Sequence, residues 1–193
     1  NYRGIVRVRK VNGESSLKLN IDDCIIRNLG TKSTSNYYGI VQTDGAVKSV
    51  IINMMNSTFA NPGGTSASLL RVDKADSISV IKNCTFYNLV DKDALVRGAK
   101  GSLTVENVLF AGSNTFQIFY DDKTLPASLN WSKVYRTSDL TVSKPGSTST
   151  TALSYSSSQL FPNASSSTDV LDLTFGADIP NEVKIIGDPR WNK

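Results

Sequence analysis

The sequence predicts an all-β protein, a right-handed parallel β-helix of about five coils that ends in a C-terminal cap. Three observations support this fold class. A motif of eleven residues occurs four times, and a short apolar strand pattern occurs five times, alternating with the motif copies. No stretch shows a sustained apolar period of 3.6 residues, as amphipathic helices would. The chain is therefore expected to stack copies of one two-strand unit, which cannot bury its apolar face alone.

The repeated motif is clearest in residues 79–89, SVIKNCTFYNL. In each copy an apolar residue stands two places before an Asn or Asp, and a second large apolar residue follows three places after it. A column of amides and carboxylates is a candidate for binding sugar hydroxyls or a cation. The fixed spacing favours a structural role instead, because Asn at a turn tolerates left-handed backbone and stacked Asn side chains bond to one another. The four copies contain Ile21, Asp23 and Ile26; Met54, Asn56 and Phe59; Ile81, Asn83 and Phe86; and Val105, Asn107 and Phe110.

The second repeat consists of short strands. They alternate with period two and are bounded by Gly, Asn, Asp and Ser, which is typical of strands separated by turns. Stacking joins each strand to its equivalent in the next repeat, so the strands are parallel, and the general preference of parallel crossovers predicts the right-handed coil. These strands are predicted at residues 4–10, 39–45, 68–74, 94–100 and 116–122.

After residue 122 the composition changes. Residues 128–135, SLNWSKVY, predict a fifth copy of the motif strand, and the Ser- and Thr-rich residues 143–168 predict long loops. A solenoid has to cover its open end, where strand edges and core side chains would otherwise be exposed. We therefore assign residues 1–124 to the coils and residues 125–193 to a capping segment. Its expected apolar anchors are Trp131, Phe161, Phe175 and Trp191.

The form Ile-x-Asn-Cys-Thr-Phe of residues 81–86 resembles the coils of the pectin-lyase-like β-helix superfamily, over roughly residues 4–122. The ending IGDPRW, residues 186–191, is similar to the C-terminus of a family of uncharacterised secreted proteins from Bacteroidetes. Together these resemblances imply an extracellular or cell-surface bacterial protein that meets polysaccharide. They imply no particular reaction, because one fold hosts many functions.

The composition of the chain indicates which classes of partner it can bind. The chain has 21 Lys and Arg, 17 Asp and Glu and no His, and its pI is near 9.0, so weak attraction to anionic glycans such as uronate polymers is expected. We expect no nucleic-acid partner, because Asp44, Asp73 and Asp121 interrupt the basic residues and no stacking platform accompanies them. We expect no membrane span, because no apolar run reaches about 18 residues. The chain opens without Met and without a signal-like segment, which suggests a mature form or a C-terminal fragment with an upstream domain.

The two cysteines are predicted to be free. Cys24 and Cys84 hold the same place in the first and third motif copies, with Ser57 at that place in the second. Equivalent positions two strands apart are about 9.6 Å from each other, beyond the reach of a disulfide. With two Cys and no His, the sequence excludes a structural zinc site and a His-based triad, and we assign no metal ligands.

The candidate carbohydrate-binding residues lie on the short strands and one insertion. Alignment places Arg7, Gln42, Arg71, Arg97 and Phe119 in one column, which alternation directs outward. The same alternation turns Ile5, Ile40, Leu69 and Leu95 outward, so this face is expected to be covered by the C-terminal segment or by a partner. The column is then either a ligand surface or a ladder of salt bridges. The predicted binding residues are Arg7, Arg71, Arg97, Lys74, Lys100, Tyr37 and Tyr38; the tyrosines either stack on a sugar or cover the core.

Two functions remain open. We favour a secreted or surface module that contacts polysaccharide, is noncatalytic in this fragment and needs no cofactor. The alternative is the C-terminal portion of a polysaccharide lyase or glycoside hydrolase acting on acidic, uronate polysaccharide. For a lyase the superfamily resemblance implies a Lys or Arg base near carboxylates, often with Ca²⁺, which takes six to eight oxygen ligands. The nearest arrangements are Asp73, Lys74 and Asp76 beside Arg71 and Arg97, and Asp91, Lys92 and Asp93, and neither identifies a catalytic residue.

Overall fold

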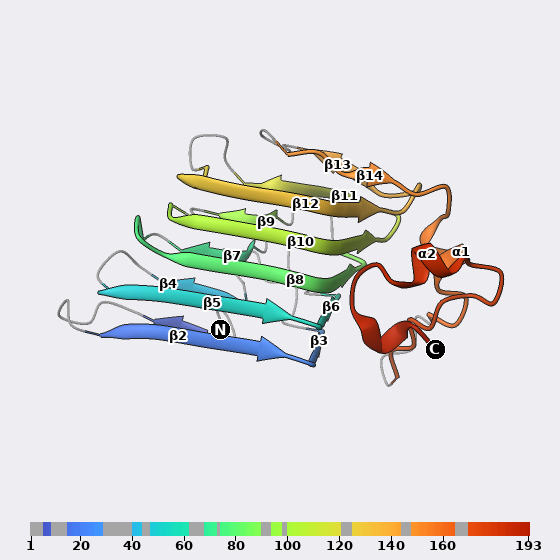
Figure 1. Cartoon of the computed structure of the whole chain (residues 1–193), viewed down its shortest axis with the longest axis horizontal. Helices are drawn as coiled ribbons and strands as arrows, with labels where there is room; N and C mark the ends of the chain where they lie inside the picture. Colours follow the sequence, from blue (N-terminus) through green and yellow to red (C-terminus); the bar gives the residue numbers. More distant parts are fainter. Residues whose placement is uncertain are drawn as a thin grey trace.

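The structure of the protein is a computed structural model. It describes residues 6–8, 15–28, 40–43, 47–61, 68–72, 74–89, 94–97, 100–120, 125–143, 148–164 and 170–193. Within these ranges, two parallel β-sheets run along the length of the stack, and three very short helices lie in the C-terminal region (Figure 1). The helices are α1 (Ser157–Leu160), α2 (Asn181–Lys184) and a 3₁₀ turn (Pro189–Trp191).

The first sheet has six strands, in the order β1-β4-β7-β9-β11-β13. The second has eight, with the path β14-β12-β10-β8-β5-β2, and β3 and β6 pair beside this path. The strands of the first sheet are β1 (Val6–Val8), β4 (Val41–Thr43), β7 (Ser68–Val72), β9 (Ala94–Arg97), β11 (Thr115–Phe119) and β13 (Thr141–Ser143). Those of the second are β2 (Ser16–Asp22), β3 (Ile25–Arg27), β5 (Ser49–Met55), β6 (Thr58–Ala60), β8 (Ile78–Tyr87), β10 (Ser102–Ala111), β12 (Ser128–Arg136) and β14 (Thr151–Ala152).

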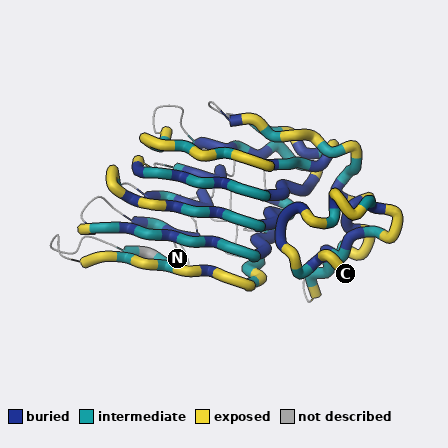
Figure 2. The backbone as a smooth tube through the Cα atoms, in the orientation of Figure 1, coloured by how far each residue is buried: buried dark blue, intermediate teal, exposed yellow. Residues whose placement is uncertain are grey.

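The connectivity confirms the predicted parallel β-helix. The chain passes from one sheet to the other in each repeat, and each strand pairs in parallel with its equivalent in the next repeat, as β8 does with β10. The six rungs of the first sheet differ slightly from the predicted five coils. Burial is strongest in the middle of the stack, whereas β2 and β12 near its ends are largely exposed or half-exposed (Figure 2).

The Asn and Asp column is structural, as predicted. Asp23, Asn56, Asn83 and Asn107 have φ values from 47° to 52°, in the left-handed region that Asn tolerates better than most residues. Asn83 donates its side-chain amide to Asn56 at 2.9 Å, and Asn107 donates to Asn83 at 3.0 Å. These bonds link the same turn in successive coils. Lys133 continues the column with φ 51° in the last copy of the motif.

A second Asn column, which the sequence analysis missed, lies five residues further along each coil. Asn28, Asn61 and Asn88 have φ values of 46° to 54°. Asn88 donates to Asn61 at 2.6 Å, and Asn114 donates to Asn88 at 3.2 Å. Each coil therefore bends at two turns that stacked amides hold in place.

The predicted aromatic column is confirmed. Phe59, Phe86 and Phe110 are at most 1% exposed, and their rings stack with centroid separations of 5.1 and 5.2 Å. Phe116 from β11 meets Phe110 at 4.8 Å, so the column joins the two sheets. Ile26 pairs in register with Phe59 at the base of the column and is half-buried.

Both cysteines are free, as predicted. Cys84 is fully buried, and this burial raises the pKa of its thiol to about 12. Cys24 is half-buried, and its backbone N–H donates to the Ser57 hydroxyl at 3.1 Å. Ser57 thus occupies the place between them that the repeat assigned to it.

Residues 128–136 form β12, which confirms the predicted fifth motif strand. The last part of the chain lies against one side of the stack, beside the ends of β8 and β10 (Figure 1). There Leu109 packs in a second apolar cluster with Phe161, Phe175 and Trp191. Trp131, expected as a fourth anchor of this segment, lies in β12 and packs against the main core instead. The boundary at residue 124 stays a prediction.

The terminal GDPRW sequence forms what we call the C-terminal clasp, residues 187–191. Asp188 is 1% exposed, accepts a hydrogen bond from the Thr58 hydroxyl at 2.7 Å and donates its backbone N–H to the Thr85 hydroxyl at 3.0 Å. Trp191 donates its indole N–H to the same Thr58 hydroxyl at 2.7 Å. Two threonines on adjacent rungs therefore hold the clasp.

Two other clasp residues, Gly187 and Arg190, also contact the coils or the residues that bind them. Gly187 has φ +82°, and a Cβ at this position would clash with the Thr85 hydroxyl, so glycine is required. Arg190 pairs with Asp188 at 2.9 Å and reaches Asp23 in the first coil at 2.6 Å. The clasp thus runs along the stack, and its sequence is explained by contacts with the coils.

Candidate functional site

The predicted column of Arg residues exists in the first sheet. Arg71 of β7 and Arg97 of β9 are register partners, and Gln42 of β4 is the partner of Arg71 on the other side. Arg7 pairs with Gln42, and its side chain lies outside the described residues. Neighbouring rungs of a parallel sheet are about 4.8 Å apart. The half-buried side chains of Gln42, Arg71 and Arg97 therefore belong to one line along the axis of the stack.

The residue predicted to follow Arg97 in this column, Phe119, is wrong by one position. Phe119 pairs with Val96, not with Arg97, and both are only 1% exposed. A large apolar side chain gains more by joining the buried neighbour than by standing beside a guanidinium, and this sets the register of β11. Tyr120 then lies beside Arg97, whose Cζ is 3.8 Å from the centre of the tyrosine ring. This is a cation–π contact, which orients the guanidinium.

The apolar positions next to the column are buried. Ile40, Leu69 and Leu95 are at most 1% exposed and belong to the main core, as do their neighbours Val41 and Leu70. These residues are thus buried as part of the core itself, and the expected cover by the C-terminal segment or by a partner stays a prediction. Among the described residues, the second apolar cluster contains no residue of the first sheet, so the described C-terminal residues are not the cover.

The other predicted binding residues are only partly placed. Lys74 is half-buried, with its ammonium 3.3 Å from Asp76, and Lys100 is exposed. The backbone N–H of Lys100 donates to the Val72 carbonyl at 3.3 Å, so Lys100 lies beside the end of β7, the strand that contains Arg71. Tyr37 and Tyr38 lie outside the described residues.

The described part of the chain contains no cluster of acidic side chains of the kind that the lyase alternative needs. There, no three His, Cys, Asp or Glu residues lie together as a metal ion would require. Asp73, Asp91 and Asp93 fall outside that part. No helix within the described ranges is long and apolar enough to cross a lipid bilayer.

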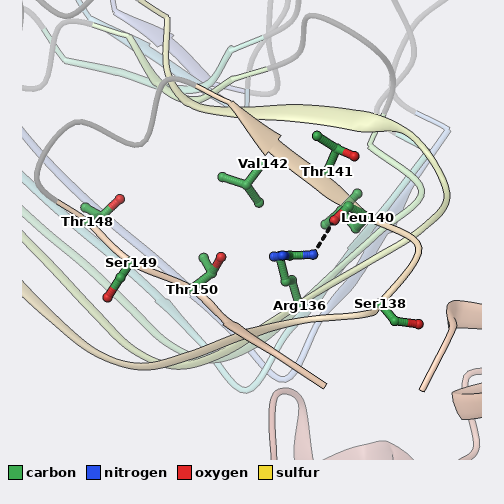
Figure 3. Close-up of a pocket in the computed structure, with 8 residues that line it drawn as sticks. All are labelled: Arg136, Ser138, Leu140, Thr141, Val142, Thr148, Ser149 and Thr150. Atoms are coloured by element: carbon green, nitrogen blue, oxygen red, sulfur yellow. Dashed lines mark hydrogen bonds between the residues drawn. The ribbon is translucent and has the colours of Figure 1, made fainter. Parts of the chain in front are cut away.

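A pocket that the sequence analysis missed lies at the last coil (Figure 3). Its volume is about 550 Å³, and the guanidinium of Arg136 occupies its centre. The signal that reveals it is the fifth copy of the motif, in which Arg136 takes the position of the aromatic column, opposite Phe110. The lining residues are Arg136, Ser138, Leu140, Thr141, Val142, Thr148, Ser149 and Thr150.

Comparisons of the chain with protein-family models, curated proteins and solved structures found no match. The parallel β-helix is thus established by strand pairing alone. The resemblances to the pectin-lyase-like superfamily and to secreted Bacteroidetes proteins stay predictions.

Proposed function

We propose that the protein is a secreted or cell-surface β-helix module of the pectin-lyase-like type that contacts anionic polysaccharide without catalysing a reaction on it. The contact surface is the column of the first sheet formed by Gln42, Arg71, Arg97 and Tyr120, which we call the arginine column. The observation that carries the proposal is the register of Arg71 with Arg97, because it places two arginines at the same position of successive rungs.

The chemistry of the arginine column supports this function. Guanidinium groups bind carboxylates through paired hydrogen bonds, and the Tyr120 ring, over which the Arg97 guanidinium lies, holds this group in place. Lys74 and Lys100 add positive charge on neighbouring segments. Cations on successive rungs act together along one polymer, whereas acid–base catalysis needs groups that converge on one bond.

The experiment replaces both arginines by glutamine and measures retention on immobilised polygalacturonate. The Arg71→Gln, Arg97→Gln variant should elute at lower salt than the parent, and rising salt should weaken the parent itself. The matched control is Lys18→Gln, Lys48→Gln, which removes the same charge from two exposed residues of other segments. This control should bind nearly as the parent does.

Two results would contradict the proposal. If the arginine variant binds as well as the parent, the arginine column is structural, and Tyr37 and Tyr38 become the next residues to test. If both double variants lose retention equally, attraction by net charge explains the binding, and no specific face is involved.

A further inference from the structure

The pocket at the last coil has a charged residue, Arg136, at its centre. In the three preceding copies of the motif, the inward position holds a phenylalanine, and Phe110 is the register partner of Arg136. A guanidinium is tolerated there because Arg136 is only half-buried, although β14 pairs with β12 at this residue. The repeat therefore places one cation next to Phe110, at the end of the aromatic column.

The hydrogen bonds of Arg136 leave donors for a ligand. Its Nη1 donates to the Leu140 carbonyl at 2.7 Å and to the Thr137 carbonyl at 3.5 Å. Within the described residues, both hydrogen bonds of the Arg136 guanidinium come from this one nitrogen, so Nε and Nη2 can take an oxyanion. The bond to Leu140 fixes the orientation of the guanidinium, which lowers the cost of ordering it on binding.

The walls of the pocket suit a sugar. Five lining residues carry hydroxyl groups, which both donate and accept hydrogen bonds, as sugar hydroxyls do. Leu140 and Val142 give an apolar surface for the C–H face of a ring (Figure 3). The volume of about 550 Å³ lies in the range of small-ligand pockets. The hydroxyl residues are Ser138, Thr141, Thr148, Ser149 and Thr150.

No carboxylate among the lining residues opposes an anion. Asp139 stands between two of them in sequence, but its carboxylate accepts hydrogen bonds from the backbone N–H of Ser157 at 2.9 Å and from the Ser157 hydroxyl at 2.6 Å. This directs the acidic group toward the start of α1. The pocket therefore carries a positive charge and is lined by several hydroxyl groups.

We propose that this pocket binds a single acidic monosaccharide unit, with the carboxylate of the sugar held by Nε and Nη2 of Arg136. The site is separate from the arginine column, because the first-sheet residues that line it, Thr141 and Val142, belong to the last strand β13, whereas the column lies on β4, β7, β9 and the residue after β11. The pocket is open to solvent, so the affinity for one unit is weak, and the pocket selects for acidic sugars over neutral ones.

The test is a titration of ¹⁵N-labelled protein with sodium galacturonate, followed by NMR. The signals of residues 148–150 and of the Arg136 Nε–H should shift. Galactose, which has the same ring without the carboxylate, should bind at least about tenfold more weakly, because a hydrogen bond to a charged group is among the strongest available. This comparison uses the parent protein and needs no variant.

Variants then locate the site. Arg136→Gln should weaken galacturonate binding by about tenfold or more. The matched control is Lys133→Gln, which removes the same charge from an exposed residue of the same strand and should leave binding unchanged. If Arg136→Gln is poorly folded, Arg136→Lys keeps the charge without the paired geometry and should also bind more weakly.

Several outcomes would overturn the proposal. Equal binding of galactose and galacturonate would exclude the carboxylate contact, and unchanged binding by folded Arg136→Gln would exclude this pocket. If sodium sulfate produces the same shifts at the same concentration, the pocket takes any oxyanion and not an acidic sugar. The Arg71→Gln, Arg97→Gln variant should keep the response, so failure at one site is distinguishable from failure at the other.

Discussion

Replacement of Thr58 by valine tests how the C-terminal clasp is held on the coils. The Thr58 hydroxyl is fully buried, donates to Asp188 at 2.7 Å and accepts from the Trp191 indole at 2.7 Å. Valine has nearly the same shape, so the change removes the hydroxyl without opening a cavity. Two buried polar groups then each lose a partner.

The expected cost follows from these two bonds. A hydrogen bond to a charged group contributes about 1.5–3 kcal/mol, and a buried donor left without its partner costs about 1–3 kcal/mol. Asp188 keeps Arg190 as a partner, which limits the loss. Thr58→Val should therefore lower the free energy of unfolding by about 2–5 kcal/mol. Thr58→Ser keeps the hydroxyl, loses one buried methyl group and should cost only about 1 kcal/mol.

Urea unfolding of both variants measures this difference. In a Trp131→Phe background, Trp191 is the remaining tryptophan, and its fluorescence reports on the clasp directly. In Thr58→Val the clasp signal should change at lower urea than the far-ultraviolet circular dichroism of the coils. If Thr58→Val is no less stable than Thr58→Ser, the threonine hydroxyl does not hold the clasp and our account of the GDPRW sequence is wrong.

Three further predictions concern the buried groups. Phe86→Ala should cost about 3–5 kcal/mol in urea unfolding, because Phe86 is stacked between two other rings; a loss below about 1 kcal/mol would contradict the aromatic column. A thiol reagent at pH 8 should modify Cys24 in the folded protein and Cys84 only after unfolding, because burial raises the pKa of Cys84 to about 12; equal rates would contradict this. Burial also raises the pKa of Asp188, although Thr58 and Arg190 oppose the rise. The stabilisation that comes from this raised pKa is therefore fully present below the pKa of the unfolded chain and is lost as the pH rises through the pKa of the folded protein. The difference in free energy of unfolding between the parent and Asp188→Asn should change over this acidic range. A difference that stays constant with pH would refute the shift.

The parts of the fold that repeat in the sequence could be predicted from it. The Asn column was recognisable because Asn56, Asn83 and Asn107 keep the same distance from an apolar residue and from a phenylalanine. Such spacing fixes both the strand register and the turn, and the hydrogen bonds between successive Asn side chains confirm it. A second column at Asn28, Asn61 and Asn88 has the same signal five places later, but in the fourth copy Gly112 stands at that place, and the Asn that continues the column, Asn114, comes two residues later.

The parts that do not repeat were not predictable in the same way. The register of β11 depends on whether Phe119 or Tyr120 lies beside Arg97, and alignment by position gave the wrong residue. Burial decides this choice, because Phe119 joins the core and leaves the amphipathic Tyr120 to the guanidinium. The clasp depends on contacts between residues more than 100 positions apart, such as Thr58 with Asp188, which local patterns do not reveal.

The most direct test of the proposed function is to map where an oligogalacturonate binds. NMR titration of the parent protein with a short oligomer should shift the Arg71 and Arg97 side-chain Nε–H signals and the Tyr120 amide together, because one polymer spans successive rungs of the arginine column. Added salt should reverse these shifts. Shifts confined to other parts of the molecule, or no shift at an oligomer concentration that saturates retention, would contradict the claim that this column contacts polysaccharide.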